Sequence, residues 1–107
     1  MNELNPKELK TYMGETNDPP IWIDVREQWE YDIVHFPDSE LIPMPELPEQ
    51  LGKLNRDSEI VVVCHHGIRS RAAGIYLEKH GFKKIINLKG GIDAWAKDVD
   101  PSMPTYD

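Results

Sequence analysis

The stretch that decides the fold covers residues 60–71 and reads IVVVCHHGIRSR. Its first four residues are β-branched and apolar without a polar interruption, which indicates a strand buried on both faces of a sheet. A short loop containing glycine follows, and a helix is predicted over 72–80 because Gly81 supplies a typical C-terminal stop. A buried strand, a loop and a helix in this order are typical of a parallel α/β sheet.

Similar signals recur on both sides of this unit. Short apolar runs at 21–25 and 84–88 predict two more strands, whereas the proline-rich segment 37–48 leaves room only for a brief strand at 41–42. Helices are expected from Pro6, with Asn5 as N-cap, and over 27–33, 48–52 and 91–97. We therefore predict an α/β fold with a central parallel sheet of four or five short strands and helices on both faces.

Length and composition bound the domain organisation. The 107 residues fit one domain, expected over 1–98, and the proline-containing segment 99–107 is expected to be a mobile tail. Hydrophobic residues make up 39% and charged residues 29% of the chain, which is typical of a soluble globular protein. The net charge of −7 argues against a nucleic-acid partner.

The same composition predicts where the protein works. The first residues are polar and give no signal-peptide pattern, and the longest apolar stretch, 60–64, is far too short to span a bilayer. Basic residues are spread out, which argues against an anionic membrane surface as a partner. With one cysteine the chain can form no internal disulfide, so a reducing, cytoplasmic setting is expected.

The single cysteine, Cys64, stands where the buried strand meets the loop. Ligands of open α/β sheets bind at the carboxyl ends of strands, and a short loop over a helix N-terminus aims several backbone N–H groups at one point. Such an anion site favours the thiolate form of Cys64. Gly67 allows backbone angles that a side chain would forbid, Arg69 adds a planar cationic donor, and Ser70 can cap the next helix or donate its hydroxyl to sulfur.

An alternative is that Cys64 is one more small hydrophobic residue at the end of the strand, as many buried cysteines are. A structural cysteine, however, needs no anion-binding loop around it. The Gly-x-Arg-Ser sequence that follows, together with the strand–loop–helix setting, favours a working thiol.

Three motifs in this sequence resemble those of the rhodanese family of sulfurtransferases. Residues 64–70 resemble the active-site loop C-x-x-G-x-R-[ST], 24–31 resemble D-V-R-E-x-x-E-[YF], and 90–95 resemble G-G-x-x-A-W. They occur in the family's order and span most of the chain. The segment 34–43 departs from the family's G-H-I-P-G-A-x-N-[IL]-P, since it keeps the histidine and both prolines but lacks the glycines and the alanine. That departure concerns the local backbone and the substrate entrance rather than the chemistry at Cys64.

The resemblance implies a rhodanese-like fold and a double displacement at Cys64. The thiolate would take the outer sulfur of thiosulfate or a similar donor, and a thiol or a sulfur-carrier protein would then accept it from the Cys64 persulfide. No metal or organic cofactor is implied. Besides the catalytic Cys64, the loop residues expected to bind substrate are His65, His66, Gly67, Ile68, Arg69 and Ser70.

Two other functions are also compatible with the motifs. The domain could be a sulfur-relay module that stores a persulfide for a protein partner, and turnover of small molecules would then be incidental. Cdc25-type phosphatases and some arsenate reductases share the fold, but their loops hold one residue more between cysteine and arginine. The shorter spacing here, residues 65–68, suits a persulfide better than a tetrahedral oxyanion bonded at the cysteine.

The four histidines do not predict a metal site. His65 and His66 are adjacent in a tight loop and should point in different directions, His35 and His80 lie elsewhere, and no second cysteine is present for a thiolate site. We expect the two loop histidines to tune access and charge.

Other charged and aromatic residues are expected to be structural. Arg26 is predicted to pair with Glu27 or Glu30 near the loop. Arg71 either supports the anion field at the start of the helix or faces solvent. The three tryptophans are expected to pack in the core or between helices, namely Trp22, Trp29 and Trp95.

Overall fold

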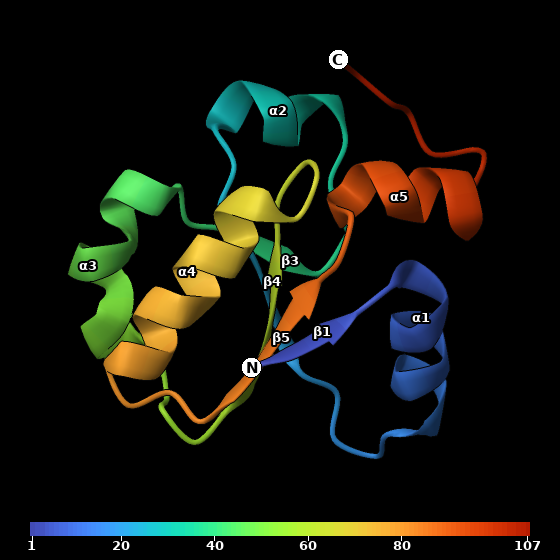
Figure 1. Ribbon diagram of the computed structural model, residues 1–107. Helices are drawn as coiled ribbons and strands as arrows, with labels where there is room; N and C mark the ends of the chain where they lie inside the picture. Colours follow the sequence, from blue (N-terminus) through green and yellow to red (C-terminus); the bar gives the residue numbers. More distant parts are fainter.

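The computed structural model describes residues 1–107, and its centre is a single sheet of five parallel strands (Figure 1). The strand order is β1-β5-β4-β2-β3, with β4 in the middle between β5 and β2. The strands are β1 (Asn2–Leu4), β2 (Ile21–Asp24), β3 (Ser39–Leu41), β4 (Glu59–Val63) and β5 (Lys84–Leu88). The predicted parallel α/β sheet is confirmed.

Helices cover both faces of this sheet, as Figure 1 shows. They are α1 (Pro6–Glu15), α2 (Gln28–Ile33), α3 (Leu47–Gln50), α4 (Ile68–Lys79) and α5 (Gly91–Asp98), and two short 3-10 turns flank α3. The helices α3 and α4 pack on one face, and α1 and α5 pack on the other. None of the helices combines the length and the apolar character needed to cross a membrane.

The core divides at the sheet because neighbouring residues of a strand point to opposite faces. In β4, Ile60 and Val62 belong to the hydrophobic cluster under α3 and α4, whereas Val61 and Val63 belong to the cluster under α1 and α5. All four side chains are fully buried. The unbroken apolar run that predicted a strand buried on both faces is therefore explained by its central position.

Local signals placed several element ends correctly. The Asn5 side chain accepts a hydrogen bond from the Glu8 N–H, while the Glu8 carboxylate accepts one from the Asn5 N–H, which forms a capping box at the start of α1. At the end of α4, Gly81 has a positive φ of 93°, as expected of a C-terminal stop.

Most predicted boundaries hold to within one or two residues, but one strand was missed and two elements are placed differently. The edge strand β1 was not predicted, because three residues with two polar side chains carry no periodic signal. The proline-rich segment holds its brief strand at Ser39–Leu41 rather than 41–42. The helix α4 begins at Ile68 rather than Ala72, so that Arg69 and Ser70 belong to its first turn.

The segment 99–107 packs against the domain instead of projecting into solvent. Met103 and Tyr106 are partly buried against the cluster under α1 and α5. The segment returns toward α2 (Figure 1), and the expected mobility of this tail stays a prediction.

Candidate active site

The cysteine loop lies at the carboxyl ends of the parallel strands, as the sequence predicts. Cys64 follows the last residue of β4 directly, and α4 begins four residues later, at Ile68. The thiol-bearing residue is almost fully buried, with 1% of its surface exposed. The central strand β4 thus places the Cys64 sulfur at the base of a loop that is followed directly by the helix α4.

Two polar contacts fix the position of the Cys64 sulfur. The Gly67 N–H donates to Sγ at 3.0 Å, and the Ser70 Oγ lies 3.3 Å from Sγ. The Ser70 hydroxyl donates its proton to the side-chain carbonyl of Asn87, while the Asn87 amide donates to the Gly67 carbonyl at 3.1 Å and to Glu3. Because the serine proton is already committed, a protonated Cys64 thiol donates to Ser70 Oγ.

Several backbone N–H groups of the loop have no acceptor in the protein and are free to bind an anion. Those of His66 and of residues 68–70 donate to no acceptor in the protein, whereas the Arg71 N–H donates to the Gly67 carbonyl and begins the helical ladder. These N–H groups stand at the positive end of the dipole of α4, a helix of 12 residues. This arrangement fits the predicted anion-binding loop next to Sγ, and binding of an anion there stays a prediction.

The start of α5 holds the cysteine loop in place from the other side. The Ile92 N–H donates to the Cys64 carbonyl at 2.9 Å, and the Asp93 N–H donates to the His65 carbonyl at 3.1 Å. A β-carbon on Gly91 would lie 2.2 Å from the His65 oxygen, and one on Gly67 would lie 2.8 Å from the backbone nitrogen of Gly90. Both glycines also have positive φ, so this close packing of two loops requires glycine.

Arg69 forms a two-point ion pair with Glu30 of α2. Its Nη1 and Nη2 donate to the two carboxylate oxygens at 2.7 and 2.8 Å, and Glu30 is 2% exposed. Burial opposes the charged form of Glu30, but the hydrogen bonds from Arg69 and Tyr106 outweigh it and lower the pKa of Glu30 to about 2. The same contact with Glu30 raises the pKa of Arg69.

The predicted partner of Arg26 was wrong. Its guanidinium pairs with Asp24, two residues away, through Nη2 and Nε, and both side chains are fully buried. Its remaining donors reach the carbonyls of Val34 and Glu30 and the Tyr106 hydroxyl. This satisfied buried pair fixes the chain after β2, and it leaves Glu30 free to hold Arg69.

His65 and His66 stack on each other instead of diverging. Their ring centroids lie 3.9 Å apart, and their ring nitrogens and the Asp93 carboxylate gather within 4.8 Å. Asp93 is already paired with Lys97 at 2.9 Å. Burial and the neighbouring His66 lower the pKa of His65, which favours its neutral form. Absence of a bound metal stays a prediction, which elemental analysis of the purified protein would check.

The other predicted residues take different places. The Ile68 side chain is 79% exposed at the rim of the loop, so only its backbone contributes to the anion site. Arg71 faces outward and pairs with Glu3. Trp22 and Trp95 pack beside α1 and α5 as expected, but Trp29 is 53% exposed.

Two functional neighbours escaped the sequence analysis. Asn87 is a buried amide between the apolar residues Ile86 and Leu88 of β5. This polar interruption of an apolar run was the signal in the sequence that could have indicated a role for Asn87. Glu30 was noted in its motif, but nothing in the sequence indicated that its partner is Arg69, which lies 39 residues away.

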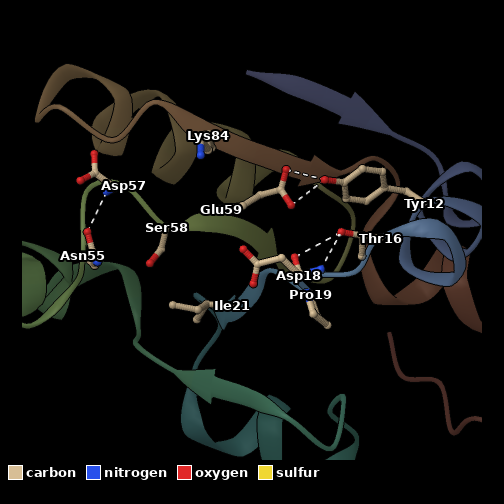
Figure 2. Close-up of a pocket in the computed structure, with 10 residues that line it drawn as sticks. All are labelled: Tyr12, Thr16, Asp18, Pro19, Ile21, Asn55, Asp57, Ser58, Glu59 and Lys84. Carbon is tan, nitrogen blue, oxygen red and sulfur yellow. Dashed lines mark hydrogen bonds between the residues drawn. The ribbon is translucent and has the colours of Figure 1, made fainter.

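The largest hollow of the molecule lies at the opposite ends of the strands (Figure 2). It has a volume of about 590 Å³, whereas the one beside the cysteine loop has about 130 Å³. Figure 2 shows Tyr12 and Glu59 facing each other, and the tyrosine hydroxyl donates to the carboxylate at 2.7 Å. The larger hollow is lined by no cysteine and lies at the opposite end of β4 from Cys64, so its size does not make it the predicted sulfur-transfer site.

Comparison with known proteins gives consistent matches. The model of the rhodanese-like domain family matches residues 5–98. A protein of Allochromatium vinosum named "Sulfurtransferase" is 32% identical over 97 residues, which cover 91% of this chain and 90% of that protein. The crystal structure of a rhodanese-like domain protein from Staphylococcus aureus superimposes with a TM-score of 0.82 at 31% identity, and the match covers all of both chains.

Some relatives are much longer than this chain. The "Probable adenylyltransferase/sulfurtransferase MoeZ" of Mycobacterium tuberculosis is 38% identical over 105 residues, which are 96% of this chain but only 26% of that protein. This chain thus spans about a quarter of the length of such relatives. The family match over residues 5–98, the relatives of similar length and the shared fold show that this chain belongs to the rhodanese-like domain family.

Proposed function

We propose that the protein is a sulfurtransferase that moves a sulfane sulfur from thiosulfate or a similar anionic donor to a thiol acceptor through a persulfide on Cys64. The observation that carries this proposal is the free backbone N–H groups of residue 66 and residues 68–70, which stand at the N-terminus of α4 beside Sγ. They suit a charge carried one atom beyond the cysteine sulfur, which is where the terminal sulfur of a persulfide lies.

The reaction consists of two displacements. The Cys64 thiolate attacks the outer sulfur of thiosulfate, a new S–S bond forms, and the S–S bond of the donor breaks with its electron pair leaving on sulfite. The acceptor thiolate then attacks the terminal sulfur of the persulfide and expels the Cys64 thiolate. The acceptor leaves as a persulfide, so sulfur moves without any external oxidant or reductant.

The surrounding residues have separate tasks in this scheme. Gly67 and Ser70 hold Sγ, and Asn87 orients Ser70. Arg69 lies beside the loop, where its positive charge attracts the anionic donor, while Glu30 sets its direction. A cysteine that has to stay reduced between turnovers fits a cytoplasmic setting, which is part of this proposal.

Sulfur loading at Cys64 tests the proposal directly. Incubation with thiosulfate should add one sulfur atom to the protein, and cyanide or a reducing thiol should remove it again. Intact-protein mass spectrometry measures both steps. The control Cys64→Ser should stay at its original mass, and an unchanged mass of the wild-type protein would overturn the proposal.

A sulfur-relay module for a protein partner is the second candidate. Its support is the near-complete burial of Cys64 together with a relative in which the matching region is a quarter of a longer protein. The two functions differ in the acceptor. An enzyme should show saturable turnover with small thiols, whereas a relay module should load sulfur and release it efficiently only to a protein acceptor.

Phosphatase activity should be negligible because the loop is short. Residues 65–68 separate Cys64 from Arg69, and the Arg69 fork is occupied by Glu30. Hydrolysis of an aryl phosphate by the wild-type protein at rates comparable to sulfur transfer would show that this size argument is wrong.

A further inference from the structure

The segment 99–107 lies beyond the residues that the family model matches, yet it returns to the active site. The N–H groups of Val99 and Asp100 both donate to the Trp95 carbonyl, and the Met103 N–H donates to the Asp100 carbonyl. These bonds end α5 and turn the chain back past α5 toward α2 (Figure 1). The turn brings Tyr106 next to the cysteine loop.

The Tyr106 ring packs against aromatic residues on both sides of the site. Its centroid lies 3.9 Å from that of His65, with an angle of 10° between the planes, so the two rings are stacked. On the other side, the exposed Trp29 of α2 meets the ring edge to face at 5.8 Å. The tyrosine therefore bridges the first residue of the loop and α2.

The Tyr106 hydroxyl is tied to the ion pair of Arg69. It donates to Glu30 Oε2 at 2.6 Å and accepts from Arg26 Nη1 at 2.9 Å. Burial and the hydrogen bond to Glu30 raise the pKa of Tyr106 to about 12, so the hydroxyl keeps the proton that it donates. A charge-assisted hydrogen bond and an aromatic stack together hold this side chain against the site.

This arrangement closes one side of the approach to the sulfur. His65 follows Cys64 directly and is 8% exposed under the Tyr106 ring. On the same side, Tyr106 and Arg69 both donate to the carboxylate of Glu30. Ile68, at the start of α4, is 79% exposed and leaves the other side of the loop open, where a small anion would have access. On this geometry a bulky molecule would need the space that Tyr106 occupies beside His65.

We propose that Tyr106 is a specificity-determining residue of the Cys64 site, which admits small donors and acceptors and excludes bulky ones while the segment 99–107 is docked. The inference rests on the proposed function for its choice of substrates, but access to Cys64 can be measured without any sulfur transfer.

Alkylation of Cys64 provides that measurement, because the chain has no other cysteine to react. The probes are iodoacetamide, which is small, and a maleimide carrying a polyethylene-glycol chain, which is bulky. The rate constant for alkylation by each probe is measured by mass spectrometry. The quantity compared between variants is the rate constant for the bulky maleimide divided by that for iodoacetamide. Tyr106→Ala should raise this ratio about tenfold over wild type, because it removes both the stack and the hydrogen bond that hold the segment closed.

Two further variants distinguish loss of the Tyr106 cover over the Cys64 site from a general loosening of the fold. Tyr106→Phe keeps the ring on His65, so its ratio should stay far below that of Tyr106→Ala. Tyr76→Ala removes a partly buried tyrosine that packs beside His80 on α4, away from the loop, and should leave the ratio at the wild-type value. An unchanged ratio in Tyr106→Ala, or an equal rise in Tyr76→Ala, would overturn the inference.

Acceptor kinetics extend the test to turnover. Tyr106→Ala should raise kcat/KM for a bulky thiol relative to kcat/KM for cyanide by about the same tenfold factor. If thiosulfate loads no sulfur on wild type while the alkylation ratio still rises in Tyr106→Ala, the proposed function fails and the cover stands. If sulfur loads normally but neither ratio changes, the cover fails and the proposed function stands.

Discussion

The two ends of β4 differ more than any other two regions of this molecule. Glu59 at the amino end borders a hollow of about 590 Å³, where the polar side chains are exposed or partly exposed and bonded in separate pairs (Figure 2). Cys64 beyond the carboxyl end stands in a loop whose neighbours Asp24, Arg26 and Glu30 are buried and connected to one another.

The contrast follows from the direction of a parallel sheet. At the carboxyl ends the chain enters helices, so the N–H groups and positive dipole ends of α4 and α5 converge there, and polar side chains can be buried with partners. At the amino ends the chain arrives from helix C-termini and loops, which bring no set of N–H groups or positive dipole ends to one point. The volume of a hollow is therefore a poor indicator of the active site here. A network of buried polar side chains joined by hydrogen bonds is a better one.

The buried ion pair offers the largest test of this contrast. Arg26→Ala leaves the Asp24 charge buried and unpaired, and it also removes donors from two carbonyls and the Tyr106 hydroxyl. We expect a loss of about 3–5 kcal/mol in the free energy of unfolding, measured by urea denaturation. The matched change at the amino end, Lys84→Ala, should cost no more than about 0.5 kcal/mol. Similar losses in both variants would erase the distinction between the two ends.

The pH dependence of stability tests the Glu30 carboxylate. Its pKa is lowered from 4.5 to about 2 in the folded protein, so the ion pair stabilises the fold fully above pH 4.5 and less as the pH falls toward 2. This shift corresponds to roughly 3 kcal/mol. Urea denaturation between pH 7 and 2.5 should show that Glu30→Gln lacks this part of the acid destabilisation, whereas Glu59→Gln retains it. Parallel curves for wild type and Glu30→Gln would contradict the assignment.

Activity of Arg69 variants tests the electrostatic role of the carboxyl end. Arg69→Ala removes the positive charge that we propose attracts the donor. A charge-assisted interaction is worth about 1.5–3 kcal/mol, so kcat/KM for thiosulfate should fall about ten- to a hundredfold. Arg69→Lys should recover only part of the loss, since an ammonium keeps the charge but not the two-point fork that Glu30 holds in place. Wild-type kinetics in Arg69→Ala would assign the anion site to the backbone N–H groups alone.

The smallest effect is expected at the amino end. Tyr12→Phe removes the hydrogen bond to Glu59 that raises the pKa of Tyr12, at a site remote from the sulfur. Its kcat/KM for thiosulfate should stay within about twofold of wild type, and its Tm should fall only slightly. A loss as large as that of Arg69→Ala would show that the amino-end hollow takes part in function.

The sequence predicted the parts of the fold that depend on neighbours along the chain. The apolar run of β4, the N-cap at Asn5 and the stop at Gly81 are local signals, and each was confirmed. The start of α4 was placed four residues late because the loop motif and the first helical turn share the same residues. The edge strand β1 was missed because an exposed strand needs no apolar pattern.

The sequence by itself determined the fold and predicted Cys64 as the nucleophile, because the alternation of strands and helices and the spacing of Cys64, Gly67 and Arg69 can be read along the chain. Only the tertiary structure decided that Glu30 pairs with Arg69 and that Tyr106 donates to the same carboxylate. The physical reason is that a buried charge takes whichever partner the packed elements bring within reach. That choice depends on the order of the strands and the path of the last segment, which no local pattern encodes.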